Sequence, residues 1–421
     1  MEGLADGKPC RVASARMTPG AKKGFRTGTH RTVAPAAVVE RIRPLVGDFG
    51  ITRVANVTGL DRIGLPVVMV ARPNARSIAV QQGKGLSLDA ARASGLMEAV
   101  ESFHAEHILL PVRLASRREL EPAVRLVSPA TLPHALTSRY HDDLPMLWIE
   151  GRELLAGEPV WLPYELVHAN FTLPQPPGSG CFPASTNGLA SGNHPLEALV
   201  HGLCEVIERD ATTLFHALDR PGRDARRLDP ASVTDDTCRE VIERLEEAGF
   251  GLGLFDCTTD LGVPCFRALL LDQRHPYEHI GIGAGCHPAR DVALLRALTE
   301  AVQVRMTYIV GARDDLLAGQ FTRAGRNRKL AHARLMLGTA RAERTFDALP
   351  SFDGDTFDED LEWLLERCHG AGLGEVVAVD LSRPEFGLPV VRVVVPGLEP
   401  PDDGPDYVIG PRARRAWEAG R

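Results

Sequence analysis

The sequence contains no C-x-x-C pair, although eight cysteines are scattered along its 421 residues. A zinc ribbon or a thioredoxin-type redox site therefore has no support. The chain also lacks any run of about 18 apolar residues, which a membrane-spanning helix needs, and the segment from Met1 to Gly20 has no apolar stretch of the secretory kind. We therefore expect a cytoplasmic protein, with no membrane partner, whose cysteines are free thiols.

Aromatic residues and net positive charge are scarce as well. Phe, Trp and Tyr make up 5% of the chain, so the core has to be built from Leu, Val, Ala and Ile. The formal net charge of −7 argues against a large basic surface for nucleic acid and against a polybasic membrane anchor. What is present, 44% apolar and 24% charged residues, is typical of a soluble globular protein. A chain of this length forms one large enzyme-sized unit or two coupled domains.

Local patterns predict an α/β (mixed α+β) fold. Three long helices are expected over residues 87–107, 195–218 and 290–312, with Ser87 and Asn193 as N-caps. Shorter helices are expected near 35–46, 328–343 and 358–371. Short apolar runs predict strands at 65–71, 77–82, 253–257, 263–272, 376–381 and 389–396. No internal repeat is visible, and the order of the strands does not follow from these patterns.

Two glycine-rich segments are candidates for contact with phosphate. The segment Gly83-Lys84-Gly85 precedes a predicted helix but lacks the spacing of a Walker loop. Residues 281–288 are expected to form a glycine-rich loop, and Cys286 stands where a dinucleotide-binding motif needs its third glycine. Neither segment alone identifies a nucleotide site.

The first chemical signal lies in the helix that follows Gly85. Ser94, Glu98 and Glu101 are spaced so that they share one face of this helix. Neither glutamate is followed four positions later by a basic residue, and two like charges on one face repel each other. A bound metal ion is the cation that this pattern favours.

The second signal repeats the pattern on the next long helix. Glu205 and Glu208 share a face, and Glu197 lies about two turns earlier, after Asn193. Ligand sets made only of oxygen suit Mg²⁺, which commonly bridges substrate phosphates. Two carboxylate pairs on two helices could thus hold two such ions against one nucleotide.

Each of these patterns is also consistent with a role without chemistry. A Glu-x-x-Glu pair on an exposed helix is usually solvated, and Glu205 could form an ordinary ion pair with Arg209. However, the residues around both pairs make the two helices apolar nearly all round, and buried carboxylates need partners. Glu101-x-x-His104 also resembles half of a di-iron site, which leaves a redox protein as a third hypothesis.

A basic segment, Lys22-Lys23-Gly24-Phe25-Arg26-Thr27-Gly28-Thr29-His30-Arg31, lies near the N-terminus. Its composition alone favours a solvated terminus over a phosphate clamp. His201 and His216 are more typical of ordinary helix contacts than of metal ligands.

Taken together, these stretches resemble the YcaO family, ATP-dependent enzymes that activate a peptide-backbone amide. The matching segments occur in family order over roughly residues 20–400. They are Lys23/Arg26 with 28–31, 83–85 leading to Ser94, Glu98 and Glu101, 186–193 leading to Glu197, Glu205, Glu208 and Arg209, 283–288 leading to Glu300-Ala301-x-Gln303, and 393–399. The resemblance implies a catalytic domain over 21–400. We expect a flexible segment over 1–20, from the richness of residues 1–30 in Gly, Lys, Arg and Thr, and a tail over 401–421.

The resemblance also implies roles for individual residues around ATP and Mg²⁺. Glu98, Glu101, Glu205 and Glu208 would hold Mg²⁺. The nucleotide would be bound by Ser94, Asn193, Glu197, Arg209 and Gln303, with Lys23 and Arg26 near the phosphates. No catalytic residue, and in particular no general base, is assigned.

In YcaO-like chemistry a nucleophile adds to an amide carbonyl, and the resulting oxyanion takes the γ-phosphoryl group of ATP. A Cys, Ser or Thr nucleophile gives an azoline, whereas external sulfide gives a thioamide. The chain ends 410–421 without the Pro-x-Pro-x-Pro tail common among azoline-forming members. The internal sequence resembles that of family members that work with a TfuA-type protein and are associated with thioamidation. We therefore expect thioamidation of a ribosomally made peptide or protein.

Two alternatives remain beside this expectation. An azoline-forming cyclodehydratase could work with a leader-peptide-binding partner in trans, and a non-catalytic accessory protein could bind nucleotide without chemistry. The resemblance further implies a homodimer.

Overall fold

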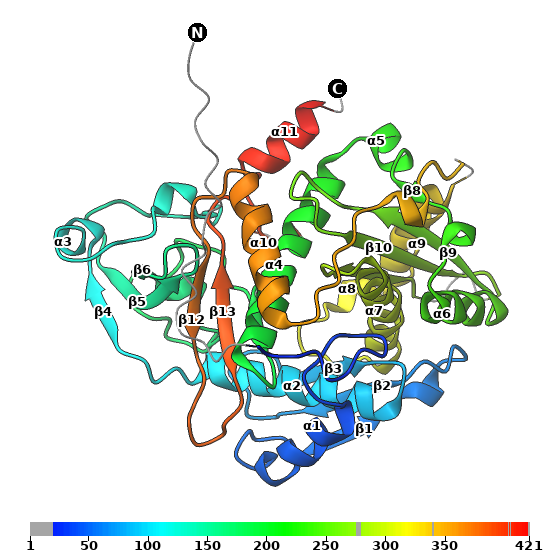
Figure 1. The fold of residues 1–421 in the computed structure, drawn as a ribbon, viewed down its shortest axis with the longest axis horizontal. Helices are drawn as coiled ribbons and strands as arrows, with labels where there is room; N and C mark the ends of the chain where they lie inside the picture. The colour runs from blue at the N-terminus through cyan, green and yellow to red at the C-terminus, as the bar shows by residue number, and fades with distance from the viewer. Residues whose placement is uncertain (1–19, 275–278, 339–340, 403, 405, 420–421) are drawn as a thin grey trace.

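The computed structural model describes residues 20–274, 279–338, 341–402, 404 and 406–419, and its strands form three sheets (Figure 1). The first sheet has the order β1 (Arg53–Asn56), β2 (Val67–Ala71), β3 (Val80–Lys84). The second has the order β11 (Gly281–Cys286), β10 (Cys265–Asp272), β9 (Phe250–Asp256), β8 (Arg227–Leu228). The third has the order β4 (Val112–Ala115), β5 (Met146–Glu153), β12 (Val377–Asp380), β13 (Val390–Val394), β7 (Leu189–Ser191), and β6 (Pro159–Pro163) pairs with β5. The strand pairs within these sheets are antiparallel.

In each sheet, one strand leads directly into one of the three predicted long helices. These helices are α2 (Leu88–Glu106), α4 (Pro195–Ala217) and α7 (Arg290–Val310), which directly follow β3, β7 and β11. The predicted cap Ser87 is confirmed, because its side chain accepts a hydrogen bond from the N–H of Ala90. The predicted cap Asn193 is wrong. His194 caps α4 instead, by accepting from the N–H of Leu196, and this leaves the Asn193 side chain available to Glu197.

Shorter helices fill the periphery. They are α1 (Pro35–Ile42), α3 (Arg117–Leu120), α5 (Arg220–Asp224), α6 (Asp236–Glu247), α8 (Ala318–Phe321), α9 (Arg323–Leu337), α10 (Phe357–Gly370) and α11 (Pro411–Ala419). The helix predicted near 328–343 corresponds to α9, while positions 339–340 lie outside the described residues. Figure 1 shows α4 and α10 running side by side through the middle of the molecule, between the third sheet and the second.

The predicted loop over 281–288 is instead the edge strand β11 with a short connection to α7. Its glycines are needed for close packing rather than for chain reversal. A Cβ atom on Gly285 would lie 2.1 Å from the carbonyl oxygen of Ala293 in α7. Gly83 in β3 has the same relation to α2, where its Cβ would lie 2.0 Å from the oxygen of Ala91. Strand and helix backbones are thus in direct contact at both places.

Gly83→Ala is therefore expected to lower the free energy of unfolding by about 3 kcal/mol, the upper end of the usual cost of overpacking, since neither neighbouring backbone can move away cheaply. Urea denaturation would measure this loss. Gly374→Ala is the matched control, because a Cβ there meets no atom within 4 Å. Equal stability of the two variants would contradict the close packing of β3 on α2.

The core has the composition that the scarcity of aromatic residues predicts, with Leu, Val, Ala and Ile in the majority. The seven described cysteines are buried and free, as expected, while Cys10 lies outside the described residues together with most of the segment predicted to be flexible. Among the described residues, no helix has both the length and the apolar character needed to cross a membrane.

Candidate functional site

The three long helices bring five glutamates to one region of the molecule. Glu98 and Glu101 come from α2, Glu205 and Glu208 from α4, and Glu300 from α7. Their charges act on one another: Glu205 and Glu98 raise the pKa of Glu101, and Glu300 and Glu205 raise the pKa of Glu208. The two predicted carboxylate pairs are therefore neighbours, and Glu300 joins them.

Burial is the largest cause of a raised pKa at each of the four predicted metal ligands. It raises the pKa of Glu101 to about 8 and that of Glu208 to about 7, and it also raises those of Glu98 and Glu205. Three of the four side chains are nevertheless only half-buried. Carboxylates that repel one another in a low-dielectric region, yet can still be reached, are suited to binding a cation.

Backbone N–H groups of the strands orient these carboxylates. The N–H of Gln82 in β3 lies 3.3 Å from Glu98 Oε2, and the N–H of Ala284 in β11 lies 3.1 Å from Glu300 Oε2. Both bonds span 16 residues, so the β3–α2 and β11–α7 units repeat the same local geometry. Glu101 Oε1 accepts from the N–H and hydroxyl of Ser191 in β7, at 2.8 and 2.6 Å. Each of the three sheets thus supplies a backbone donor to the cluster.

Basic side chains surround the carboxylate cluster. Lys84 Nζ lies 3.7 Å from Glu300 Oε2, and Arg209 Nη1 lies 3.4 Å from Glu208 Oε1. Burial lowers the pKa of Arg392 to about 10, and two of its nitrogens have no hydrogen-bond partner among the described residues. Burial and then the charge of Arg31 lower the pKa of Arg296. Arg31 and Arg296 therefore repel each other next to a cluster of carboxylates that also repel one another.

Glu197 is bound by the segment that precedes α1. Its Oε2 accepts from the N–H and hydroxyl of Thr32 at 2.9 and 2.8 Å, and its Oε1 lies 3.4 Å from Arg31 Nη1. Asn193 Nδ2 donates to the same Oε1 at 3.1 Å. Glu197 therefore holds the basic segment beside the start of α4, and Asn193 supports it.

The remaining predicted nucleotide contacts lie around this cluster. Ser94 is exposed on α2, one turn before Glu98. Gln303 follows Glu300 on α7 and donates from Nε2 to the carbonyl oxygen of Gln82 at 2.9 Å. Ser94 thus shares a helix with Glu98, and Gln303 binds the same residue of β3 whose N–H binds Glu98.

Lys23 and Arg26 are held by an acidic segment before and within α10. Lys23 Nζ, fully buried, lies 2.8 Å from Asp360 Oδ2. Arg26 Nη1 lies 2.8 Å from Asp353 Oδ1, and its Nη2 lies 3.3 Å from Asp355 Oδ1. The basic segment is thus fixed by ion pairs and is not a solvated terminus.

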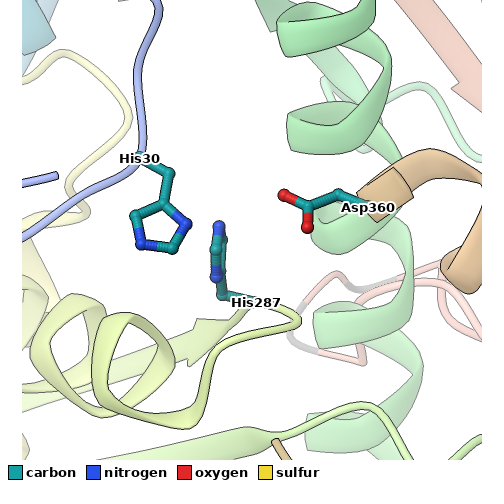
Figure 2. A group of neighbouring side chains, drawn as sticks. All are labelled: His30, His287 and Asp360. Atoms are coloured by element: carbon teal, nitrogen blue, oxygen red, sulfur yellow. The ribbon is translucent and has the colours of Figure 1, made fainter. Parts of the chain in front are cut away.

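Next to Lys23, three buried side chains that could act as metal ligands meet. Figure 2 shows His287 standing between His30 and Asp360, and one ligand atom of each lies within 4.8 Å of the others. Two contacts do not fit a metal ion. His287 Nδ1 accepts from the N–H of Ala289 at 3.0 Å, so the proton of the neutral ring is on Nε2. Asp360 is already neutralised by Lys23.

The structure does not support the di-iron hypothesis, because His104 and Glu101 have separate partners. His104 Nδ1 contacts the carbonyl oxygen of Val100 at 2.7 Å, and its ring packs against Phe49 and Phe386, whereas Glu101 is bound to Ser191. His216 makes a contact outside the carboxylate cluster, at 2.8 Å from Asp402 Oδ2. Burial, followed by the charges of Arg31 and Arg296, lowers the pKa of His201 well below its usual value.

Sequence reasoning gave no individual role to Lys84, Glu300, Arg31, Arg296 or Arg392. Lys84, Glu300 and Arg31 stand in segments that were recognised as motifs, so a signal for them existed. Arg392 lies in a predicted strand and carries no local signal. Only the pairing of β13 with β7 brings it near Glu205.

Comparison with known sequences finds one matching family model and related sequences that cover most of the chain. A protein-family model described as YcaO cyclodehydratase, ATP- and Mg²⁺-binding, matches residues 82–399. A Rhizobium leguminosarum bv. trifolii protein, described as an uncharacterized protein in the tfuA 3′ region, is 37% identical and covers 91% of this chain and 92% of its own length. A Methanothermobacter thermautotrophicus protein is 35% identical over 88% of this chain and 95% of its own length.

Solved structures share the fold. YcaO from Methanopyrus kandleri bound with AMPPCP and Mg²⁺ superposes with a TM-score of 0.73 at 26% identity, over 90% of this chain and 95% of that one. A heterocyclase in complex with substrate and cofactor gives a TM-score of 0.74 at 23% identity over 90% of this chain. The present chain spans 54% of that heterocyclase, so the likeness concerns the fold.

Proposed function

Because this chain belongs to the YcaO family, we propose that it uses ATP and Mg²⁺ to phosphorylate the oxygen of a peptide-backbone amide and so forms a thioamide. The substrate is a ribosomally made peptide or protein. A sulfur donor supplies the nucleophile, and a TfuA-type protein is the partner. The relative described by its place in the tfuA 3′ region supports this choice over azoline formation.

The observation that carries the proposal is the unbalanced charge of the site. Five carboxylates lie beside buried or half-buried cations, and like charges repel within both groups, Glu98 and Glu205 acting on Glu101 and Arg31 acting on Arg296. A metal–triphosphate complex has the complementary arrangement, since it presents cations to the carboxylates and anionic oxygens to the basic groups. A single small ion could neutralise either the carboxylates or the basic side chains, but not both.

The donor set fits Mg²⁺ because it consists of oxygen atoms held by backbone N–H groups. Glu98, Glu101, Glu205 and Glu208 would hold it, with Glu300 as an additional ligand. When bound, Mg²⁺ neutralises charge on the phosphates and aligns the group that is transferred.

The chain's own side chains bind and orient the nucleotide. Arg209 and Lys84 lie next to the carboxylates and are paired with Glu208 and Glu300, respectively. Phosphate oxygens would replace these two glutamates as their partners. Ser94, Asn193, Glu197 and Gln303 line the same site as nucleotide contacts. Arg26 exchanges its present carboxylate partners for phosphate oxygens. Lys23 stays bound to Asp360 and adds its positive charge near the phosphates.

A direct test mixes the protein with ATP, Mg²⁺, sulfide, a TfuA-type protein and a candidate precursor peptide. We expect ADP and phosphate to be released, and the peptide mass to change by exchange of one oxygen for one sulfur. Loss of one water would instead identify an azoline-forming enzyme. Nucleotide-dependent thermal stabilisation without phosphate release from any peptide would identify a non-catalytic accessory protein and contradict the proposal.

A further inference from the structure

The cluster of His30, His287 and Asp360 has no part in holding the metal–nucleotide complex as proposed above. Its members come from the basic segment, from the connection between β11 and α7, and from α10 (Figure 2). They are 5%, 2% and 0% exposed. Three buried polar side chains from distant parts of the chain, packed beside a phosphate-binding segment, call for a chemical reason.

His287 is fixed as a neutral hydrogen-bond donor. Ala289, whose N–H binds His287 Nδ1 at 3.0 Å, is the N-cap residue of α7. Burial, and then the charge of Arg296, holds the pKa of His287 well below its usual range. The Nε2–H group is therefore present at any working pH. A neutral imidazole held at a helix N-terminus in this way can polarise a carbonyl group.

His30 supplies a basic nitrogen. Its ring lies 4.9 Å from that of His287 and is nearly perpendicular to it. Its Nδ1 is buried without a hydrogen-bond partner among the described residues. Asp353 Oδ1 lies 3.9 Å from this atom and would stabilise the imidazolium form. A neutral imidazole has one nitrogen with a lone pair, so His30 can accept a proton.

The surroundings set the protonation state of both rings. The charged groups acting on the pair are Lys23, Arg26, Arg31, Arg296 and Asp353. Burial and then Lys23 lower the pKa of His30 to about 4. A bound triphosphate would cancel much of this positive charge and make His30 more basic. The base would thus become effective when nucleotide is present.

We propose that His30 is the general base and His287 the hydrogen-bond donor to the amide oxygen in the reaction proposed above, on which this assignment rests. Asp360 is a positioning residue, because it holds Lys23 beside both rings. The ligand that the cluster recognises is a peptide amide together with the sulfur nucleophile that attacks it.

The proposed step balances. The sulfur of HS⁻ forms a bond to the carbonyl carbon, and the C=O π pair moves to the oxygen, which accepts a hydrogen bond from His287 Nε2–H. This oxygen then attacks the γ-phosphorus, and ADP leaves with the electron pair of the broken P–O bond. His30 takes the remaining S–H proton as the C–O bond breaks, C=S forms and phosphate departs with the C–O electron pair. The imidazolium returns its proton to phosphate, so amide, HS⁻ and ATP give thioamide, ADP and hydrogen phosphate.

The test compares His30→Ala and His287→Leu with wild type in the peptide reaction. Each variant is expected to turn over about 10² to 10⁴-fold more slowly, with nucleotide affinity near that of wild type. Added imidazole should restore part of the activity of His30→Ala, which a merely structural role for His30 would not predict. His134→Asn is the matched control, because His134 contacts Pro129 and Ser138 away from the site.

The outcomes separate this assignment from the proposed function. Wild type active on peptide and His30→Ala equally active would overturn the assignment alone. A wild type that forms no peptide product with sulfide would overturn both. Stoichiometric zinc or iron in the purified wild type, lost from His30→Ala and His287→Leu alike, would show that the cluster is a metal site and would also overturn the assignment.

Discussion

Glu98→Gln and Glu205→Gln are each expected to reduce ATP consumption on the order of 10² to 10³-fold, the loss that follows removal of one electrostatic contact to a transition state. Glutamine preserves the size of the side chain but cannot bring a negative charge to Mg²⁺. The two residues lie on α2 and α4, so both helices are tested.

These two substitutions should leave the fold intact. Burial raises the pKa of both residues, so the unliganded protein already disfavours the charged form that glutamine removes. The midpoint of urea denaturation should stay unchanged or rise, while phosphate release collapses. Glu243→Gln, at an exposed position of α6, serves as the control for both measurements. Unchanged ATP consumption in both site variants would refute the metal assignment.

The stability of the unliganded protein is expected to fall between about pH 5 and pH 9, and Mg²⁺ with a non-hydrolysable ATP analogue should remove most of this fall. The pKa values of Glu101 and Glu208 rise from 4.5 to about 8 and about 7 in the folded chain. Between these values and 4.5 the folded state binds more protons than the unfolded state. Stability therefore decreases as pH rises, by an amount on the order of a few kcal/mol.

Metal binding should remove most of this dependence because a cation stabilises the ionised carboxylates and expels their protons. Thermal unfolding at several pH values, with and without the metal–nucleotide complex, measures the effect. A Glu101→Gln, Glu208→Gln double variant should show a flatter pH profile and little stabilisation by ligand. If wild type and this variant respond alike, the two carboxylates are not metal ligands.

The three long helices were predictable because each combines an apolar surface with clear end signals. The Ser87 cap is confirmed, whereas Asn193 lost that role because its side chain binds Glu197 and His194 takes its place. The prediction of a loop over 281–288 was also wrong, because a contact with a distant part of the chain decides the structure there. Glycines usually mark turns, but in β11 they mark close contact with a helix, which no local pattern can distinguish.

The candidate site was predictable in its acidic half and much less so in its basic half. Glutamates spaced three apart stand on one helix face, so Glu98 and Glu101 could be paired from spacing alone. Arg392 comes from a strand and Arg31 from an irregular segment, and no sequence period relates them to the glutamates. His30, His287 and Asp360 belong to the same class, because more than 70 residues separate each from the next along the chain.

By itself, the amino-acid sequence determined where the long helices run, which carboxylates share a face, and which family the ordered motifs resemble, because these features depend on neighbours within a few residues. Tertiary structure alone decided that α2, α4 and α7 converge, that β3 and β11 present equivalent backbone donors, and that the basic segment binds α4 and α10. Such relations depend on packing between segments up to hundreds of residues apart, and only burial and mutual repulsion turn ordinary glutamates and arginines into a site that needs a ligand.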